Sequence, residues 1–286
     1  ELSKVRSLQE LISGRRDRTF GSPKIIIAIL DRGVESKEVN GQLVPVHPDL
    51  NVNLTDGSSK VCEFYDFKNM RSGNTPDDGW GTLEDHGVSC AGLAAAAANN
   101  PSPVTSEAEG IVGASPNCRL MALKRDPDGG DHEYADAFMW ASGLKPANTA
   151  FPAPPSQGAD VISISFWRSD LAISGVMSDC LDAITRDGRN GKGVLVVIAA
   201  GNGATDINRK TAWAAYEKTI VVAGSTESDE RDPLSNFGKG IDLCAPTGLV
   251  TCCNIDSNTN NHFLAGHTGG SHDYDPSFGG TSAAAP

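Results

Sequence analysis

The sequence has no excess of positive charge and no long hydrophobic run. Lysine and arginine total 24 against 36 aspartate and glutamate residues, which gives a formal net charge of −12. Nucleic acids and anionic membrane surfaces bind clustered positive charge, so we expect neither as a partner. No apolar stretch approaches the ~20 residues that cross a bilayer, so we expect no membrane-spanning helix. These absences argue against nucleic-acid-binding and membrane proteins.

The sequence also lacks any Cys-x-x-Cys pair and any histidine–cysteine spacing typical of a zinc finger. A structural zinc site is therefore not expected. The cysteines are odd in number, so at least one thiol is free or paired with another molecule. Several lie in apolar segments, where a buried cysteine behaves as a small hydrophobe. The seven positions are Cys62, Cys90, Cys118, Cys180, Cys244, Cys252 and Cys253.

Aromatic residues make up only 6% of the chain, whereas hydrophobic residues of all kinds make up 39%, which predicts an aliphatic core. Continuous apolar runs are typical of central strands in a parallel sheet, and residues with helical apolar spacing lie between many of them. The alternation predicts an α/β fold: a three-layer, doubly wound, mostly parallel sheet with helices on both faces. The runs cover residues 24–30, 119–124, 161–165, 194–199, 219–223 and 241–244.

The length of 286 residues suits one large domain, and no linker-like segment divides it, so we expect a single domain over 1–286. Ligands of such sheets bind beyond the carboxyl ends of the strands. Asp31, Ser165 and Asn202 are the polar residues that we expect there. Polar loops are expected over 68–85, 99–110, 145–158 and 254–278.

The chain ends on the small residues Gly-Gly-Thr-Ser-Ala-Ala-Ala-Pro, in which Ser282 has no bulky neighbour. A nucleophilic hydroxyl needs such space, because a substrate carbonyl must approach it and a backbone N–H must face the developing oxyanion. The alanine run favours a helix that begins at the serine. The alternative is a small-residue turn before a buried alanine-rich helix.

Two other segments supply the partners that a nucleophilic serine needs. Asp31 follows the apolar run 24–30, and His86 opens a helix-prone segment over 86–99. A histidine can accept the serine proton, and a carboxylate can hold that histidine in the right tautomer. Asn202, between two glycines, can donate its amide to an oxyanion. Each alone has a plain alternative as a cap or a turn, but together they indicate a serine hydrolase.

These motifs resemble the subtilases, the serine peptidases of the subtilisin and kexin superfamily, from about residue 20 to 286. Within this family, the alanine that follows the serine (Ala283) and Cys90 favour a resemblance to the kexin-like branch. The segments that carry the resemblance are Asp31-Arg32-Gly33-Val34, His47-Pro48-Asp49-Leu50, His86-Gly87 with Cys90-Ala91-Gly92, Gly110–Pro116, Ile162–Ser165, Ala199–Gly203, Ser235-Asn236-Phe237-Gly238 and Ala245-Pro246.

The resemblance implies a serine endopeptidase that hydrolyses peptide bonds of a polypeptide substrate through an acyl-enzyme. Ser282 would attack, His86 would act as base and then as acid, and Asp31 would orient His86. The Asn202 side chain and the backbone N–H of Ser282 would bind the oxyanion. The substrate-binding residues that it implies are Ser165, Phe166, Trp167, Asp126 and Gly201.

The chain departs from the family pattern at two positions near these residues. Arg32 stands where Thr or Ser is usual and kexins have an acid, which speaks against dibasic specificity. We expect this cation to lie beside Asp31 and to lower its pKa. Trp167 stands where glycine is usual, so we expect a reshaped specificity pocket. An acidic loop over 126–133 predicts a mild preference for basic substrates; the alternative is a solvated loop.

The resemblance also implies a structural calcium ion, with Asp49 and Asn100 as candidate ligands. Calcium takes six to eight oxygen ligands, the sequence offers only two or three, and the insertion 101–109 interrupts the ligand loop. Near the candidate histidine, Cys90 lies one helical turn from His86, so we expect mercurials to inhibit the enzyme.

The expected partners are a polypeptide substrate and a propeptide or chaperone-like inhibitor, and we expect a secreted monomer. A subtilase-fold pseudoenzyme that serves as a binding module is the alternative, motivated by Arg32 and Trp167. A dinucleotide-binding protein would need Gly-x-Gly-x-x-Gly with a following acid, and an α/β-hydrolase would need a Gly-x-Ser-x-Gly elbow; the sequence has neither.

If Ser282 opens a helix, the residues that follow it complete only about one turn, too little to stabilise a helix by itself. We therefore expect the domain to be truncated just after the serine. We also expect residues 1–286 expressed alone to be unstable or inactive.

Overall fold

The computed structural model describes residues 20–72, 85–98, 110–125, 129–166, 172–207, 213–214, 216–253 and 274–286. An eight-stranded sheet has the order β10-β9-β8-β7-β1-β6-β4-β5. Its neighbouring strands are parallel, except that β5 is antiparallel to β4. The strands are β1 (Ile26–Asp31), β4 (Val61–Asp66), β5 (Arg71–Ser72), β6 (Arg119–Lys124), β7 (Val161–Ile164), β8 (Leu195–Ala199), β9 (Thr219–Ser225) and β10 (Leu243–Pro246).

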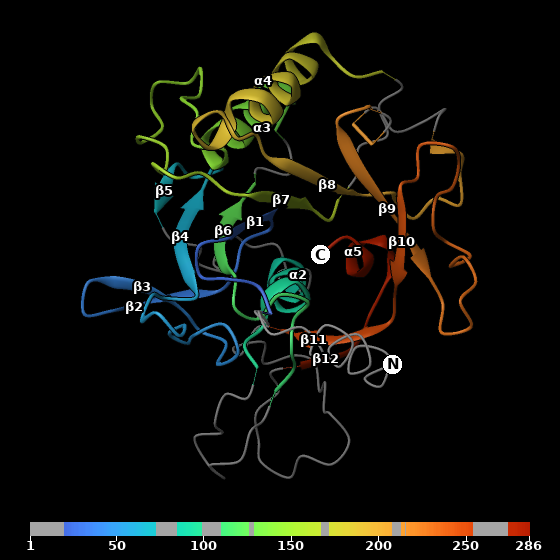
Figure 1. Ribbon diagram of the computed structural model, residues 1–286, viewed down its shortest axis with the longest axis horizontal. Helices are drawn as coiled ribbons and strands as arrows, with labels where there is room; N and C mark the ends of the chain where they lie inside the picture. Colours follow the sequence, from blue (N-terminus) through green and yellow to red (C-terminus); the bar gives the residue numbers. More distant parts are fainter. Residues whose placement is uncertain are drawn as a thin grey trace.

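Helices cover both faces of this sheet (Figure 1). Helices α3 (Asp131–Ala141) and α4 (Gly175–Gly191) pack together on one face. Helices α2 (Asp85–Ala95) and α5 (Gly280–Ala284) contact each other on the opposite face. The prediction of a three-layer, mostly parallel α/β fold is confirmed. None of the helices in the described part of the chain is both long and apolar enough to cross a membrane.

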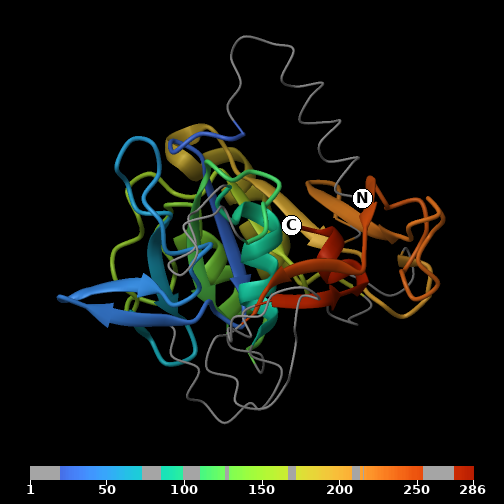
Figure 2. The same cartoon turned by 90° about the horizontal axis from the view of Figure 1, so that it is seen from below.

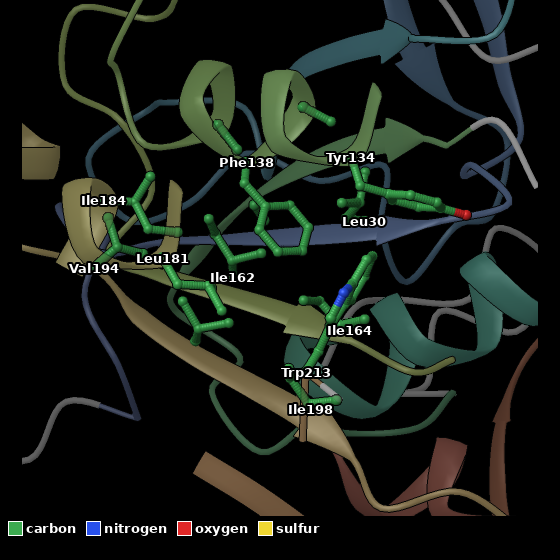
Figure 3. Packing of buried hydrophobic residues seen from close by; sticks show 14 of the residues in the cluster. Leu30, Tyr134, Phe138, Ile162, Ile164, Leu181, Ile184, Val194, Ile198 and Trp213 are labelled. Carbon is green, nitrogen blue, oxygen red and sulfur yellow. The ribbon is translucent and has the colours of Figure 1, made fainter. Parts of the chain in front are cut away.

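The larger hydrophobic core lies between the sheet and the α3–α4 layer (Figure 3). Alternate residues of the central strands point into it, including Leu30 of β1 and Ile162 and Ile164 of β7, all fully buried. Phe138 of α3 and Leu181 of α4 fill the space above them. The residues between these strand positions face α2 and α5, so both faces are apolar, as the continuous runs predicted.

Several strands lie where the sequence indicated none. The expected loop 254–278 ends in strand β12 (Tyr274–Phe278), which pairs antiparallel with β11 (Leu249–Cys252) under α2 (Figure 2). The expected loop 68–85 contains β5. A hairpin of β2 (Ser36–Val39) and β3 (Gln42–Pro45) and the inner strand β4 were also missed. Mixed polar residues in these strands hid them, because pairing partners rather than apolar runs define short strands.

Candidate active site

The topology places three predicted polar residues at one edge of the sheet. β1 ends at Asp31, β7 is followed by Ser165, and β8 is followed by the segment that carries Asn202. These three strands are neighbours in the order β8-β7-β1 and are parallel. Their carboxyl ends therefore meet, and His86 of α2 and Ser282 of α5 reach the same edge from the covering layer.

Asp31 and His86 form a direct pair. His86 Nδ1 lies 2.7 Å from Asp31 Oδ1, and the Arg32 backbone N–H donates to the same oxygen at 2.7 Å. The Asp31 side chain is almost completely buried, and its second oxygen Oδ2 has no hydrogen-bond partner among the described residues. A Cβ at Gly87 would collide with the Gly33 carbonyl oxygen, so glycine is required for α2 to begin this close to β1.

Charge sets the protonation of this pair. Burial by itself lowers the pKa of His86, but the charge of Asp31 and its hydrogen bond reverse this and raise the pKa well above its usual value. For Asp31, burial by itself would raise the pKa. The charge and hydrogen bond of His86 and the charge of Arg125 outweigh this effect, so the pKa of Asp31 lies below its usual value. The arrangement therefore favours an imidazolium–carboxylate pair.

The predicted influence of Arg32 takes a different form from the one expected. Its backbone N–H bond helps to lower the pKa of Asp31, whereas the guanidinium whose charge contributes is that of Arg125. Arg125 directly follows β6, whose Lys124 is in register with Asp31, and the backbone N–H of Arg125 donates to the Asp31 carbonyl. This strand register is the signal from which Arg125 could have been found.

Ser282 lies in α5 with 9% of its surface exposed. Its Oγ donates a hydrogen bond to the Ser165 carbonyl at 2.8 Å, and Ser165 Oγ donates to the Ser282 carbonyl at 3.1 Å. Cys90 Sγ lies 3.8 Å from both the Ser282 carbonyl oxygen and His86 Nδ1. Cys90 thus links Ser282 to the Asp31–His86 pair, while the serine hydroxyl is bonded to a backbone carbonyl rather than to the imidazole.

The Asn202 side chain is fixed by the residue before the serine. Asn202 Oδ1 accepts hydrogen bonds from Thr281 N at 2.8 Å and from Thr281 Oγ1 at 2.9 Å. The Gly201 N–H in turn donates to Thr281 Oγ1 at 3.0 Å. Gly280 has φ +68°, and a Cβ there would contact the Asn202 amide. Because Oδ1 is occupied, the amide nitrogen Nδ2 is the group left to bind a ligand.

An aromatic cluster borders the candidate substrate-binding residues. The Arg125 guanidinium lies 4.1 Å from the centroid of the Phe166 ring and donates to Tyr134 Oη at 2.9 Å. Trp213 packs against both Tyr134 and Phe166. No sequence pattern indicated that these three residues lie next to Phe166. Trp167 and Asp126, two of the expected substrate-binding residues, lie outside the described residues.

Asp49 was predicted to bind calcium together with Asn100, which lies outside the described residues. Asp49 Oδ2 accepts hydrogen bonds from the Ile111 N–H and from Tyr274 Oη, each at 3.0 Å. His47 and Cys252, also buried, bring nitrogen and sulfur atoms within 4.8 Å of the carboxylate. Hard cations need six to eight oxygens, so the described residues around Asp49 do not by themselves fit calcium.

The chain is similar to known proteins over most of its length. A model of the subtilase family matches residues 22–286. The chain is 28% identical over 287 residues to the calcium-dependent protease of Trichormus variabilis, and the matched region covers 91% of this chain and 37% of that protein. It is 30% identical over 224 residues to thermitase of Thermoactinomyces vulgaris, covering 78% of this chain and 63% of thermitase.

The solved structure of a protease from Pseudoalteromonas arctica is similar with a TM-score of 0.67 and 25% identity, over 94% of this chain and 76% of that one. The chain spans less than two thirds of the length of these curated relatives: 37% of the calcium-dependent protease and 63% of thermitase. The family match covers both candidate halves of the site, the Asp31–His86 pair and the Asn202–Ser282 segment. The chain belongs to the subtilase family.

Proposed function

We propose that this chain is the catalytic domain of a serine endopeptidase in which Ser282 is the nucleophile, His86 the general base and Asp31 the residue that orients His86. The observation that supports this most strongly is the 2.7 Å bond between Asp31 Oδ1 and His86 Nδ1, together with a serine in the first turn of helix α5. Asp31 at Nδ1 leaves Nε2 as the nitrogen that can accept the serine proton.

The reaction begins when Ser282 Oγ turns from the Ser165 carbonyl towards His86. The oxygen attacks the substrate carbonyl carbon while its proton passes to His86 Nε2, and the carbonyl π electrons move to the oxygen. Collapse of this intermediate expels the amine, which takes the proton from His86 and leaves an acyl-enzyme. Water then repeats the steps with the same groups and releases the acid. The Asp31 carboxylate stabilises the imidazolium that forms in each half.

The oxyanion would be bound by Asn202 Nδ2 and the backbone N–H of Ser282. The hydrogen bonds from Thr281 to Asn202 Oδ1 fix the amide before substrate arrives. Donors positioned in advance cost no reorganisation during the reaction, and this preorganisation is the main source of their catalytic effect. We expect Asn202→Ala to lower kcat about 10²–10³-fold, the loss known for the equivalent change within this family.

The substrate is proposed to be an extended polypeptide that lies along Ser165 and Phe166, with Gly201 on the opposite side. Phe166 presents a ring already packed by Arg125, Tyr134 and Trp213, so we expect an apolar or aromatic contact rather than a deep charged pocket there. The predicted preference for basic residues from the acidic loop 126–133 remains to be tested, and cleavage profiling on a peptide library is the measurement.

Two properties of the relatives lead to proposals about calcium and location. Two relatives bear the name calcium-dependent protease, and others are named extracellular proteases. We therefore propose that the protein is secreted and that calcium stabilises it. Chelation should lower its melting temperature, and calcium should restore it. Asp49→Asn tests the one candidate ligand within the described residues. If chelation lowers the melting temperature of this variant as much as that of the wild type, Asp49 is not a calcium ligand.

A hydrolysis assay tests the proposed nucleophile. In the intact protein, Ser282→Ala should abolish cleavage of peptide amides, whereas Ser163→Ala should not. Ser163 is the matched control, because it lies two residues before Ser165 in a neighbouring buried position and its hydroxyl has no hydrogen-bond partner in the described part of the chain. Cleavage retained in a folded Ser282→Ala protein would refute the proposal.

A further inference from the structure

The segment that carries Asn202 depends on a second asparagine for its shape. Asn236 is fully buried, whereas Asn202 is exposed. Residues 200–205 include Gly201 with φ +93° and Ala204 with φ +46°. Such left-handed conformations are unfavourable for alanine and persist only where surrounding contacts impose them. Contacts from outside residues 200–205 must therefore hold this turn, which carries Asn202, the proposed oxyanion donor.

Asn236 bonds to the chain on both sides of Asn202. On the side before it, Asn236 Nδ2 donates to the Ala200 carbonyl at 2.7 Å, and the Asn236 backbone N–H donates to the Gly201 carbonyl at 2.8 Å. On the side after it, Asn236 Oδ1 accepts from Gly203 N at 3.0 Å and from Thr205 N at 3.0 Å. One side chain thus fixes both ends of the turn at whose tip Asn202 lies.

Other contacts also hold the backbone of this segment. The Ala204 and Thr205 backbones pair with Leu234 and Phe237, the Ala200 N–H donates to the Val222 carbonyl, and the Gly201 N–H donates to Thr281 Oγ1. Thr205 Oγ1 also donates to Asn236 Oδ1, at 3.2 Å, so a single oxygen receives three donors. Among the described contacts, the Ala200 carbonyl and the N–H groups of Gly203 and Thr205 are held by the Asn236 side chain.

We propose that Asn236 is a positioning residue for the oxyanion donor: it holds the 200–205 turn from behind while Thr281 fixes the Asn202 amide from the front. The proposal rests on the proposed function, because it acts through Asn202. Loss of the Asn236 side chain leaves the buried Ala200 carbonyl and the part-buried N–H groups of Gly203 and Thr205 without this partner, and the turn relaxes. A displacement of about 1 Å at a catalytic group can cost about 10²-fold in rate, so the effect falls on kcat.

A double-mutant cycle in the intact protein tests this role, with kcat and KM measured on a peptide amide for Asn202→Ala, Asn236→Ala and the double variant. Asn236→Ala should lower kcat about 10- to 100-fold with KM within about threefold. In the Asn202→Ala background the same change should cost less than about threefold, because the group that Asn236 positions is already absent. A purely structural role would give equal losses in both backgrounds.

Controls separate folding from positioning. Thr247→Val is matched, because Thr247 is buried in the same region and hydrogen-bonds to Ser225 and Asp232 but not to the 200–205 turn. It should lower the melting temperature and keep kcat within about threefold of wild type. If Asn236→Ala does not fold, Asn236→Asp replaces it in the cycle, since it keeps the acceptor oxygen and loses the donor to Ala200.

The outcomes distinguish this inference from the function on which it rests. If Asn202→Ala lowers kcat as expected and Asn236→Ala does not, or if the two losses simply multiply, the positioning role is wrong and the proposed function stands. If Asn202→Ala leaves kcat unchanged, the proposed oxyanion donor is wrong, and the role of Asn236 falls with it.

Discussion

The two halves of the candidate site are held by different kinds of interaction. The acid–base half, buried Asp31 and partly exposed His86, is a charged pair in which each partner shifts the pKa of the other. The oxyanion half, Asn202 with Thr281 and Asn236, is a network of neutral hydrogen bonds. Changes of pH should therefore act on the first half, whereas changes of shape should act on the second. Ser282 lies where the halves meet.

The largest expected effect comes from removing the charge of the acid–base half. Asp31→Asn keeps the size of the side chain but lets its amide donate to His86 Nδ1, which places the proton on the wrong nitrogen. We expect kcat to fall about 10⁴-fold, the loss measured for the equivalent change in a serine peptidase of another fold. Steady-state hydrolysis of a peptide amide is the measurement. A loss below tenfold would mean that Asp31 does not orient His86.

A smaller loss is expected in the neutral half. Thr281→Val keeps the shape of the side chain but removes the hydroxyl that donates to Asn202 Oδ1 and accepts from the Gly201 N–H, while the Thr281 backbone N–H still donates to Oδ1. The loss of these two hydrogen bonds costs on the order of 1–2 kcal/mol, which corresponds to roughly tenfold in kcat. Thr281→Ser keeps the hydroxyl and is the control. Equal rates for the valine and serine variants would show that the hydroxyl does not hold the amide.

The pH dependence should separate the halves most cleanly. His86 must be neutral to accept a proton, and its pKa is raised by Asp31, so kcat/KM should rise with pH beyond the usual range of histidine and fall as the solution is acidified. Thr281→Val should lower this profile without moving it. Asp31→Asn should move it to lower pH, because burial alone lowers the pKa of His86. A profile in Asp31→Asn at the wild-type position would contradict the charge-based account.

The smallest effect is expected at Cys90, which lies beside His86 and the Ser282 carbonyl but has no role in the proposed reaction. Burial raises the pKa of its thiol, so the thiolate is scarce and the side chain serves as packing. Cys90→Ala should keep kcat within about threefold. Inhibition of the wild type by a mercurial should be slow, because the thiol is buried, and it should be absent in Cys90→Ala, because a metal on Sγ, 3.8 Å from His86 Nδ1, would displace the imidazole. Mercurial inhibition that persists in Cys90→Ala would place the sensitive thiol elsewhere.

Sequence patterns predicted the Asp31–His86 pair and the central strands of the sheet better than the hydrogen-bond network around Asn202. Asp31 could be found because continuous apolar runs define the central strands, and a polar residue at such a strand end stands out. His86 could be found because it opens a helix-prone segment and a nucleophilic serine needs a base. The bond between them followed from the chemistry of a serine nucleophile. The short strands β5, β11 and β12 could not be found in this way, because their pairing depends on contacts with distant residues.

The partners of Asn202 illustrate what the sequence leaves open. The Ser-Asn-Phe-Gly segment at 235–238 matches a landmark of the family, but nothing in its pattern says which carbonyl the Asn236 amide will bond to. Only the tertiary structure shows Asn236 under the Asn202 turn. In the same way, the hydrogen bonds to Asp49 from Ile111 and Tyr274 come from distant segments, and no pattern around Asp49 indicated them.

The most direct test of the account is to find which residue a serine-directed reagent modifies. A fluorophosphonate should form one covalent adduct on the peptide that carries Ser282, located by mass spectrometry. Labelling should be abolished in Ser282→Ala and slowed in Asp31→Asn, because His86 must accept the proton as the oxygen attacks phosphorus. An adduct on another residue, or no adduct on a folded wild-type protein, would contradict the claim that both halves converge on Ser282.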